Sequence, residues 1–338
     1  MPEAGVVFRG LSAAGFDRAR PWTLLTSSAR LAASTFTAWR WLGERRPDVV
    51  IGFGGYVSIP VGFAAALRKI PLVLHEQNSV PGLANKTLSR WARAVGVTYE
   101  ESAEQLARPE RAVVTGNPVR PAVLAANRTG GRASLGLPPD ALVLLVFGGS
   151  RGARHLNAAL ISLRERLLAI PGLCILHVAG AAEAATVADA LQNAGGDDGG
   201  RWRVVSYVDD MGSALAAADL IVARAGATSI AEITALGLPA VLVPYPFATD
   251  DHQTKNAAAM VAHGAAEVVA DADIDGERFG DIVVGLLCDP ARRATMAAAS
   301  KGLGRPDAAD RVAALARQAA GHPSAHNEPE SDPEDSDV

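Results

Sequence analysis

Residues 142–153 read LVLLVFGGSRGA and residues 219–229 read DLIVARAGATS, so each stretch is an apolar run that ends in a glycine-bearing turn. Uninterrupted apolar runs are typical of strands that are buried on both faces, as in a parallel sheet. An alanine-rich helical pattern follows each turn. The two stretches therefore predict strand, tight turn and helix in succession, which is the repeating unit of an α/β fold.

The same pattern recurs along the chain. Further apolar runs begin near residues 48, 71, 94, 112, 173, 203, 240 and 266. A spacing of roughly 20–30 residues is typical of right-handed crossovers between parallel strands. A stretch with Pro and Gly, residues 121–139, separates the first four predicted strands from the remaining six. We therefore expect one α/β domain over residues 1–120 and a second over residues 121–305.

Length and composition agree with two globular domains. The chain has 338 residues, and 49% of them are hydrophobic. Six acidic residues and no basic residue occupy positions 327–338, so the net charge of −4 arises largely there. Because that segment combines Pro, Ser and acids with almost no apolar side chain, we expect residues 321–338 to form a disordered acidic tail.

Basic and aromatic residues do not alternate as nucleic-acid binding requires, so no nucleic-acid partner is expected.

The cysteines and the amino-terminal residues indicate the cellular location of the protein. The two cysteines, Cys174 and Cys288, are far apart in the chain, which is typical of a reducing cytosol. The first residues contain neither a basic nor an apolar segment of a secretory signal. Residues 49–67 carry no charge, but Gly52, Gly54, Gly55 and Pro60 interrupt them. We therefore expect a strand, a glycine turn and a helix from about Val57 there rather than a membrane span.

Residues 22–43 show a helical pattern with two interpretations. Leu25, Ala29, Ala32, Phe36 and Trp39 fall on one helical face. That face either packs into the core or forms an interfacial surface on an anionic membrane. Tryptophan and leucine flanked by arginine are typical of the second case, and six arginines lie within or beside this segment, namely Arg18, Arg20, Arg30, Arg40, Arg45 and Arg46.

Three glycine-rich turns follow predicted strands, at residues 52–56, 148–153 and 224–229. Such a turn exposes backbone N–H groups at a helix start, where the helix dipole favours an anion. A single turn of this kind is often no more than a tight connection, whereas three favour a nucleotide diphosphate. No Gly-Lys-Ser/Thr follows any of them, and no dinucleotide fingerprint is present.

Polar side chains near the ends of predicted strands are further candidates. Glu232 lies on the helix after the third turn, where it either binds ribose hydroxyls or faces solvent. Gln253 and Asn256 carry amides that suit sugar hydroxyls, while Asp250 and Asp251 fit the start of a helix better than a metal site. His75 is either a general base or a structural hydrogen-bonding group. No zinc-type spacing occurs, so we expect no metal and no cofactor.

Longer motifs in a fixed order resemble one bacterial family. This family adds N-acetylglucosamine to undecaprenyl-pyrophosphoryl-muramyl-pentapeptide, converting lipid I to lipid II. The resemblance implies two Rossmann-like domains facing across a cleft, the GT-B glycosyltransferase arrangement. The matching segments are 47-PDVVIGFGGYVSIP, 74-LHEQNSVPGLANK, 115-TGNPVR, 147-FGGSRGARHLN, 224-RAGATSIAEITALGLPAVLVP and 250-DDHQTKNA.

The resemblance also implies partners and placement. The second domain is expected to hold UDP-N-acetylglucosamine, and the first to bind the undecaprenyl-linked muramyl-pentapeptide. The protein is expected to be peripheral, on an anionic membrane surface at the cytoplasmic face of the cell membrane. Residues 306–320 are expected to form a helix that packs back on the first domain. The reaction inverts the anomeric centre without a cofactor.

Residue roles are implied by matching motif positions. Ser150 meets the donor diphosphate, and Val208 takes the uracil position. Glu232 binds the ribose, and Gln253 recognises sugar hydroxyls. The helix start at Ala227, Thr228 and Ser229 lies on the phosphate side, and Asn78 and Arg120 match further positions assigned to the donor.

One family motif has no counterpart in the sequence. The family begins with a strand and Gly-Gly-Thr-Gly-Gly-His, which occurs nowhere in this chain. The resemblance therefore implies a first domain lacking its first strands, and leaves His75 and Glu76 as catalytic candidates. An alternative function is a catalytically impaired homologue that binds a UDP-sugar. A UDP-sugar epimerase of the same fold is a further alternative, against which the His-Glu-Gln-Asn and Gly-Asn-Pro-Val-Arg segments argue.

Overall fold

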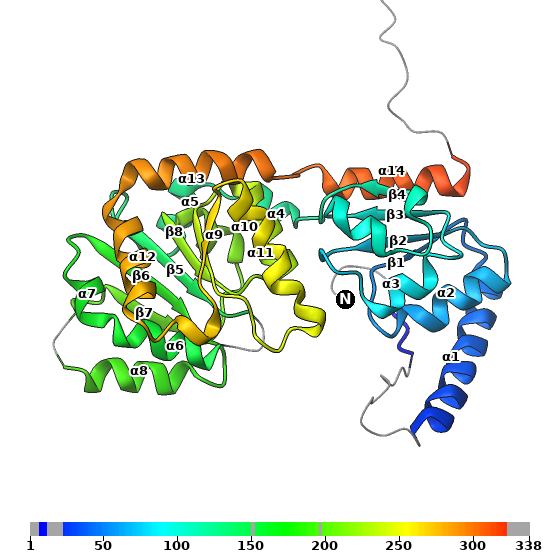
Figure 1. Ribbon diagram of the computed structural model, residues 1–338, viewed down its shortest axis with the longest axis horizontal. Coiled ribbons are helices and arrows are strands. Elements are labelled where there is room, and N and C mark those ends of the chain that lie inside the picture. Colours follow the sequence, from blue (N-terminus) through cyan, green and yellow to red (C-terminus); the bar gives the residue numbers. More distant parts are fainter. Residues whose placement is uncertain (1–6, 12–22, 150–152, 196–197, 323–338) are drawn as a thin grey trace, which may run out of the picture. The chain divides into compact units, whose positions relative to one another are not determined.

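The computed structural model describes residues 7–11, 23–149, 153–195 and 198–322, which form two compact α/β units (Figure 1). Unit 1 comprises Met1–Glu76, Pro81–Val114 and Asp310–Val338. Unit 2 comprises Gln77–Val80 and Thr115–Ala309. The chain therefore crosses between the units several times, and the short segment after Glu76 belongs to unit 2.

Unit 1 is built on a parallel sheet in the order β1-β2-β3-β4. Val50 pairs with Leu72, Val73 with Ala94, and Val95 with Ala112. Leu72, Leu74, Val95 and Val97 lie in one apolar cluster, while Val73 packs with Leu315 and Ala319 of the last helix. The described strands of unit 1 are β1 (Val50–Gly52), β2 (Leu72–Glu76), β3 (Ala94–Val97) and β4 (Ala112–Val114). Its helices are α1 (Thr23–Arg45), α2 (Ser58–Leu67), α3 (Leu83–Leu88) and α14 (Ala308–Ala320, from Asp310 on), with 3-10 turns η2 (Glu100–Gln105) and η3 (Pro109–Arg111).

Unit 2 has a parallel sheet in the order β10-β9-β8-β5-β6-β7, with helices on both faces (Figure 1). From β5 the chain moves outward through β6 and β7, then returns to β8 on the other side of β5 and continues to β9 and β10. The strands are β5 (Leu142–Phe147), β6 (Leu173–Val178), β7 (Trp202–Val205), β8 (Leu220–Ala223), β9 (Ala240–Leu242) and β10 (Ala266–Val268). The helices are α4 (Pro121–Leu124), α5 (Arg128–Ser134), α6 (Arg154–Ser162), α7 (Arg164–Leu168), α8 (Ala184–Asn193), α9 (Met211–Ala217), α10 (Ala227–Leu236), α11 (His252–Ala262), α12 (Glu277–Cys288) and α13 (Pro290–Leu303), with 3-10 turns η4 (Thr249–Asp251) and η5 (Asp271–Asp273).

The position of β5 in the middle of the sheet explains why its sequence is apolar throughout. Leu144 and Val146 face one apolar cluster, and Leu145 and Phe147 face the other. A strand covered by helices on both sides buries every side chain. In an open sheet of this kind ligands bind at the carboxyl ends of the strands, where the strand order reverses. That switch point lies between β5 and β8.

All ten predicted strands occur, and the predicted α/β fold with two parallel-sheet domains is confirmed. The uncharged segment 49–67 forms β1, a turn and α2, as predicted. No helix in the described part of the chain is long and apolar enough to cross a membrane. The predicted acidic tail lies almost entirely outside the described residues.

Helix α1 forms as predicted, but the core-facing interpretation of its aromatic face is wrong. Phe36 is 60% exposed and Trp39 is 38% exposed. Among the α1 residues whose burial is described, 29–45, the buried positions are instead Ser34 and Ala38. Helix α1 packs against α2, and small side chains at the buried positions allow the two helices to approach closely. The aromatic side chains are left on the surface of unit 1.

Candidate functional site

Unit 2 has a pocket of about 680 Å³ at the switch point of its sheet. The carboxyl ends of β5, β6, β7 and β8 contribute to it, which is where an open α/β sheet binds ligands. The residues that line it are Gln77, Asn78, Arg120, Phe147, Gly149, Val178, Gly180, Ala181, Ser206, Tyr207, Val208, Met211, Gly226, Ala227, Thr228, Ser229 and Glu232.

The amino end of helix α10 forms part of the pocket wall. Gly226 is the N-cap, and no side chain caps the first turn. The backbone N–H groups of Ala227, Thr228 and Ser229 have no acceptor within the helix, because the first turn of any α-helix lacks one. Together with the helix dipole, these N–H groups form a binding place for an anion.

A second glycine turn borders the same pocket after β5. Gly149 has φ +82°, a backbone conformation that L side chains rarely adopt, so the turn favours glycine. Helix α6 begins after this turn, and its N-cap residue Ala153 provides no side-chain cap. Ser150, the residue predicted to meet the diphosphate, lies outside the described residues.

Glu232 occupies the second turn of α10 and is only 5% exposed. The solvent-facing interpretation of this residue is therefore wrong. Its Oε1 accepts hydrogen bonds from Nη2 of Arg120 at 3.0 Å and from Nε at 3.2 Å. A buried carboxylate needs such a partner, and the Arg120 side chain, which is 58% exposed, provides it from the pocket rim. The carboxylate of Glu232 therefore lies about one helical turn from the amino end of α10, where an anion can bind.

Asn256 holds the segment 77–80 inside unit 2. Its side chain is fully buried, and its Oδ1 accepts hydrogen bonds from the backbone N and the Oγ of Ser79 at 2.9 and 3.0 Å. Its Nδ2 donates to Oδ1 of Asn78 at 3.2 Å and to the carbonyl of Ala225 at 3.4 Å. The expectation that Asn256 binds sugar hydroxyls is therefore wrong, because its amide is used within the fold. Its contacts place Asn78 on the pocket wall.

Gln253 lies on α11, after β9, and does not line the pocket. Its Oε1 accepts a hydrogen bond from the backbone N of Tyr245 at 2.9 Å. The preceding residues Asp250 and Asp251 both have positive φ, 53° and 52°. Asp251 takes the N-cap position of α11 as predicted, but its carboxylate accepts a hydrogen bond from the Thr254 hydroxyl and caps no backbone N–H.

His75 and Glu76 end strand β2 in unit 1. His75 is fully buried, with its ring centroid 5.7 Å from that of Phe53. Glu76 is 3% exposed, and its Oε2 accepts hydrogen bonds from the backbone N of Gly82 at 3.0 Å and from Nδ2 of Asn85 at 2.8 Å. This carboxylate therefore fixes the start of α3. The catalytic roles of both residues stay predictions.

Sequence reasoning did not single out several residues of the pocket. Phe147, Ser206, Tyr207 and Met211 are among them. Tyr207 is 70% exposed and directly follows β7. Its position at a strand's carboxyl end was a usable signal, because all pocket strands contribute residues from that end. Among the described residues, no three His, Cys, Asp or Glu side chains are grouped so that they could hold a metal ion.

Comparison with known proteins assigns the chain to a class. Residues 143–312 match the glycosyltransferase family 28 C-terminal domain, and residues 1–97 match the glycosyltransferase family 28 N-terminal domain. The two parallel-sheet α/β units are thus those of a family 28 glycosyltransferase.

Individual relatives narrow the class further. A UDP-N-acetylglucosamine–N-acetylmuramyl-(pentapeptide) pyrophosphoryl-undecaprenol N-acetylglucosamine transferase of Desulforudis audaxviator is 42% identical over 323 residues, which are 95% of this chain and 87% of that protein. The protein of the same name from Halalkalibacterium halodurans is 40% identical over 320 residues, with the same shares. The crystal structure of Acinetobacter baumannii MurG has a TM-score of 0.69 and 30% identity over 86% of this chain and 80% of that one. The chain belongs to this family of N-acetylglucosamine transferases, the MurG family.

More distant structures share only the fold. A co-structure of S. aureus MnaA with UDP is 15% identical with a TM-score of 0.64, and covers 88% of this chain and 84% of that one.

Proposed function

We propose that this chain carries out the reaction of its family, the transfer of N-acetylglucosamine from UDP-N-acetylglucosamine to undecaprenyl-pyrophosphoryl-N-acetylmuramyl-pentapeptide, with the pocket of unit 2 as the site of the nucleotide sugar. One observation carries this assignment of the site. The uncapped amino end of α10 and the buried carboxylate of Glu232 lie in one pocket at the switch point of the sheet.

The pocket offers groups that suit each part of the donor. The N–H groups at Ala227, Thr228 and Ser229 face the pyrophosphate, and Glu232 accepts hydrogen bonds from ribose hydroxyls. Val208, beside the end of β7, contacts the uracil. Gln253 lies on α11 outside the pocket lining, and we assign it to the sugar hydroxyls because its motif position matches that role. Ser150 lies outside the described residues, and its role at the diphosphate is likewise assigned from its motif position. Asn78 and Arg120 line the same pocket and add polar contacts to the donor.

The reaction follows from this placement. The acceptor hydroxyl oxygen forms a bond to the anomeric carbon while the bond from that carbon to the β-phosphate oxygen breaks, so the configuration inverts. Negative charge then grows on the leaving diphosphate, and the amino end of α10 stabilises it without reorganisation. The acceptor hydroxyl loses its proton to a base, for which His75 and Glu76 are the candidates predicted from the sequence.

Replacing Glu232 tests the donor site. We expect Glu232→Ala to weaken UDP-N-acetylglucosamine binding by about tenfold to about a hundredfold, because two hydrogen bonds to a charged acceptor are lost. Isothermal titration calorimetry measures the affinity, and turnover is followed with a lipid I analogue. Asp281→Asn is the matched control, since Asp281 also pairs with an arginine of unit 2, Arg166, but on the exposed face of α12. Unchanged affinity in Glu232→Ala contradicts the site.

Turnover by the same 338-residue chain separates the proposal from its alternatives. Transfer to the lipid I analogue supports the transferase. Donor binding without any transfer identifies the impaired UDP-sugar-binding homologue. Isomerisation of UDP-N-acetylglucosamine in the absence of acceptor identifies the epimerase.

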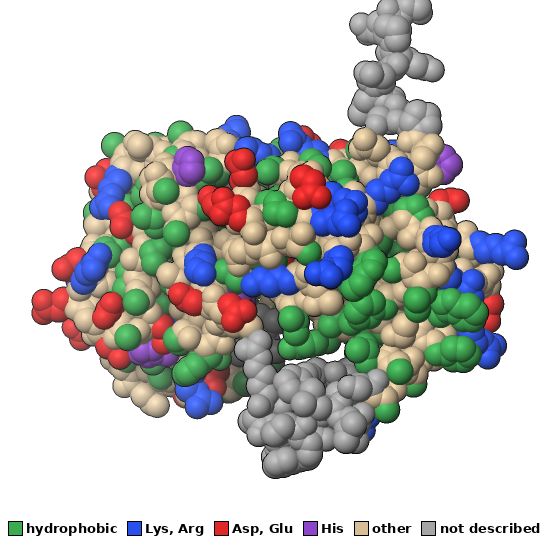
Figure 2. Space-filling view, turned by 45° about the vertical axis from the view of Figure 1, so that its right-hand side comes forward, with side chains coloured by type: hydrophobic (Ala, Val, Ile, Leu, Met, Phe, Trp, Pro, Cys, Tyr) green, Lys and Arg blue, Asp and Glu red, His purple; other side chains and the backbone are tan. Residues whose placement is uncertain are grey.

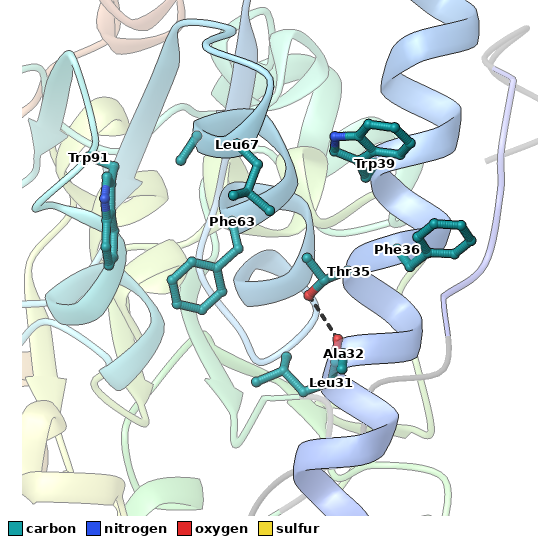
Figure 3. Close-up of a pocket in the computed structure, with 9 residues that line it drawn as sticks. Leu31, Ala32, Thr35, Phe36, Trp39, Phe63, Leu67 and Trp91 are labelled. Atoms are coloured by element: carbon teal, nitrogen blue, oxygen red, sulfur yellow. Dashed lines mark hydrogen bonds between the residues drawn. The ribbon is translucent and has the colours of Figure 1, made fainter.

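An apolar groove of about 740 Å³ lies on unit 1 and is called the α1/α2 groove (Figure 3). We propose that the protein contacts the membrane through this groove. In Figure 3 Leu31 and Thr35 of α1 and Phe63 of α2 lie between the two helices, and Trp91 flanks Phe63. The residues that line it are Leu31, Ala32, Thr35, Phe36, Trp39, Phe63, Ala66, Leu67 and Trp91.

Basic side chains adjoin this apolar surface. The guanidinium carbon of Arg68 lies 3.9 Å from the centroid of the Trp39 ring. A smaller neighbouring hollow shares Ala66 and Trp91 with the groove, and Lys69, Arg93 and Arg111 line it. In the space-filling view, hydrophobic side chains gather on unit 1 with Lys and Arg side chains at their border (Figure 2). Exposed aromatic residues beside bases suit an anionic lipid surface, which we assign as the occupant of the groove.

Vesicle binding tests this assignment. We expect Phe36→Ala combined with Trp39→Ala to reduce co-sedimentation with phosphatidylglycerol vesicles by about tenfold, because the apolar contact is lost. Phosphatidylcholine vesicles serve as the uncharged comparison. Phe247→Ala removes an aromatic residue of unit 2 that is 82% exposed and is the matched control. Unchanged vesicle binding contradicts the membrane assignment, as does a dimer in solution that the double variant converts to a monomer.

A further inference from the structure

A cluster of charged side chains lies at the carboxyl edge of the unit 2 sheet, outside the pocket described above. Asp271, the first residue of η5, is its centre. Its Oδ1 lies 2.5 Å from Nη1 of Arg224, and its Oδ2 lies 2.8 Å from Nδ1 of His155. The other ring nitrogen of His155, Nε2, lies 2.9 Å from Oδ2 of Asp275. One carboxylate thus joins two side chains that are far apart in the sequence.

The cluster connects four neighbouring strands. Arg224 directly follows β8 and begins the third glycine turn, and its Nη1 also donates to the carbonyls of Val243 and Pro244, just after β9, at 3.2 Å each. Asp271 follows β10. His155 is the second residue of α6, the helix that comes after β5 and the second glycine turn. In sheet order the network therefore runs from β10 through β9 and β8 to the helix after β5.

Burial makes these contacts important for the local structure. The side chains of Asp271 and Arg224 are 13% and 8% exposed, whereas that of His155 is 36% exposed. Removing one partner of a buried ion pair is destabilising, because the other charge remains without compensation. Burial by itself raises the pKa of Asp271, but hydrogen bonds from His155 and Arg224 outweigh it, so the pKa lies below its ordinary value. The carboxylate is thus ionised at neutral pH.

We infer that Asp271 is a positioning residue for the diphosphate of the nucleotide sugar, because it fixes the beginning of α6 relative to the turn that begins at Arg224. The amino ends of α6 and α10, neither of which has a side-chain cap, are then aligned for one diphosphate. Preorganised donors are more effective than donors that must move into place. The inference rests on the proposed donor site.

Protonation of His155 adds a pH dependence. Hydrogen bonds with Asp271 and Asp275 raise the pKa of His155. Below that pKa the imidazolium donates to both carboxylates, and above it one donor is lost. The stabilisation is therefore full at low pH and declines as the pH rises through the raised pKa. The other charged groups nearby are Arg224, bonded to Asp271, and Arg154, which pairs with Glu183.

The first experiment replaces the central carboxylate. Asp271→Asn is expected to raise both KM and Kd for UDP-N-acetylglucosamine by about tenfold while kcat changes by less than about threefold, because the displaced turns lose their common alignment. Asp281→Asn is the matched control. Thermal unfolding verifies that each variant folds. A variant that folds and binds with wild-type affinity overturns the inference.

The second experiment uses the pH profile, which a purely structural contact does not alter. The Kd of UDP-N-acetylglucosamine is measured from about pH 6 to about pH 9. UDP-N-acetylglucosamine is used rather than UDP, because the terminal phosphate of UDP titrates near about 6 and would add its own pH dependence. We expect the affinity of the wild type to fall with rising pH and that of His155→Gln to be flat over this range. His263→Gln, at the end of α11, is the control. A flat wild-type profile, or the same step in His155→Gln, overturns the pH dependence.

The outcomes for Glu232 distinguish this inference from the proposed function. If Glu232→Ala loses donor affinity while Asp271→Asn and His155→Gln behave like the wild type, only the positioning role fails. If Glu232→Ala also binds normally, the donor site itself is wrong.

Discussion

Each unit holds a buried glutamate close to a predicted site, but the partners differ. Glu76 in unit 1 receives its hydrogen bonds from the backbone of Gly82 and from the amide of Asn85, which is 2% exposed. Glu232 in unit 2 receives its two bonds at a single oxygen from Arg120, whose side chain is more than half exposed. One carboxylate is thus satisfied by the fold and the other by a side chain at a pocket rim.

The difference indicates which glutamate is available to a ligand. A ligand hydroxyl can replace Arg120 at Glu232, because a long exposed side chain can move at small cost. To contact Glu76 in the same way, a ligand must displace a backbone N–H and a buried amide, which leaves both unsatisfied. We therefore expect Glu76 to matter chiefly for the stability of unit 1, which argues against the predicted role of Glu76 as the catalytic base. Glu232 is expected to matter chiefly for binding.

The largest expected effect is that of Glu76→Ala on unit 1. Two buried donors lose their acceptor, and at ~1–3 kcal/mol each we expect a loss of roughly 3 kcal/mol in the free energy of local unfolding. Hydrogen exchange measured by mass spectrometry detects it as faster exchange in residues 72–98, with residues 142–178 of unit 2 unchanged. Glu76→Gln, which keeps one acceptor oxygen, is expected to lose less. Unaltered exchange in residues 72–98 contradicts the expectation that Glu76, unlike Glu232, acts chiefly through stability.

A smaller effect is expected for the pair of Arg120 and Glu232. A double-mutant cycle with Arg120→Ala and Glu232→Gln is expected to give a coupling of about 1 kcal/mol in the free energy of unfolding, since one partner is buried and the other is solvated. The exposed pair of Arg166 and Asp281 provides the comparison, with an expected coupling of ~0.3 kcal/mol. Equal couplings in the two cycles contradict a special role of the buried carboxylate.

The strands and most of the pocket were predictable from the sequence because their signals are local. Each strand is an apolar run bounded by a turn, and the run at β5 is apolar because both faces of the strand are covered. The glycine turns follow those strands directly. Seven of the predicted donor residues, including Val208 and Glu232, therefore line one pocket.

The errors arose where the deciding contact is distant in the sequence. Asn256 carries an amide that suits a sugar, but its partner Ser79 lies 177 residues away and fixes it within the fold. The pairing of His155 with Asp271 spans 116 residues and has no local pattern. For α1, periodicity gave the apolar stripe containing Phe36 and Trp39, but it cannot distinguish a surface groove from a core.

An effect of similar size is expected for Asp210, an exposed carboxylate at the N-cap of α9, beside the unit 2 pocket. Its Oδ1 accepts a hydrogen bond from the backbone N of Ser213 at 3.0 Å, and its Oδ2 accepts one from the Ser213 hydroxyl at 2.6 Å. These hydrogen bonds lower its pKa. Replacement by alanine is expected to cost about 1 kcal/mol in stability near neutral pH, the usual value of an N-cap.

The cost of removing this capping carboxylate is expected to depend on pH. Because the folded pKa is lowered, the charge-dependent stabilisation is present above the unfolded pKa and is lost as the pH falls through the folded one. Chemical denaturation of the wild type and of Asp210→Ala is therefore expected to differ less near about pH 3 than near about pH 7. Asp210→Ser retains an acceptor that does not titrate, so its difference from alanine is expected to be independent of pH. A cost for Asp210→Ala that is the same at both pH values means that the carboxylate caps α9 by geometry alone.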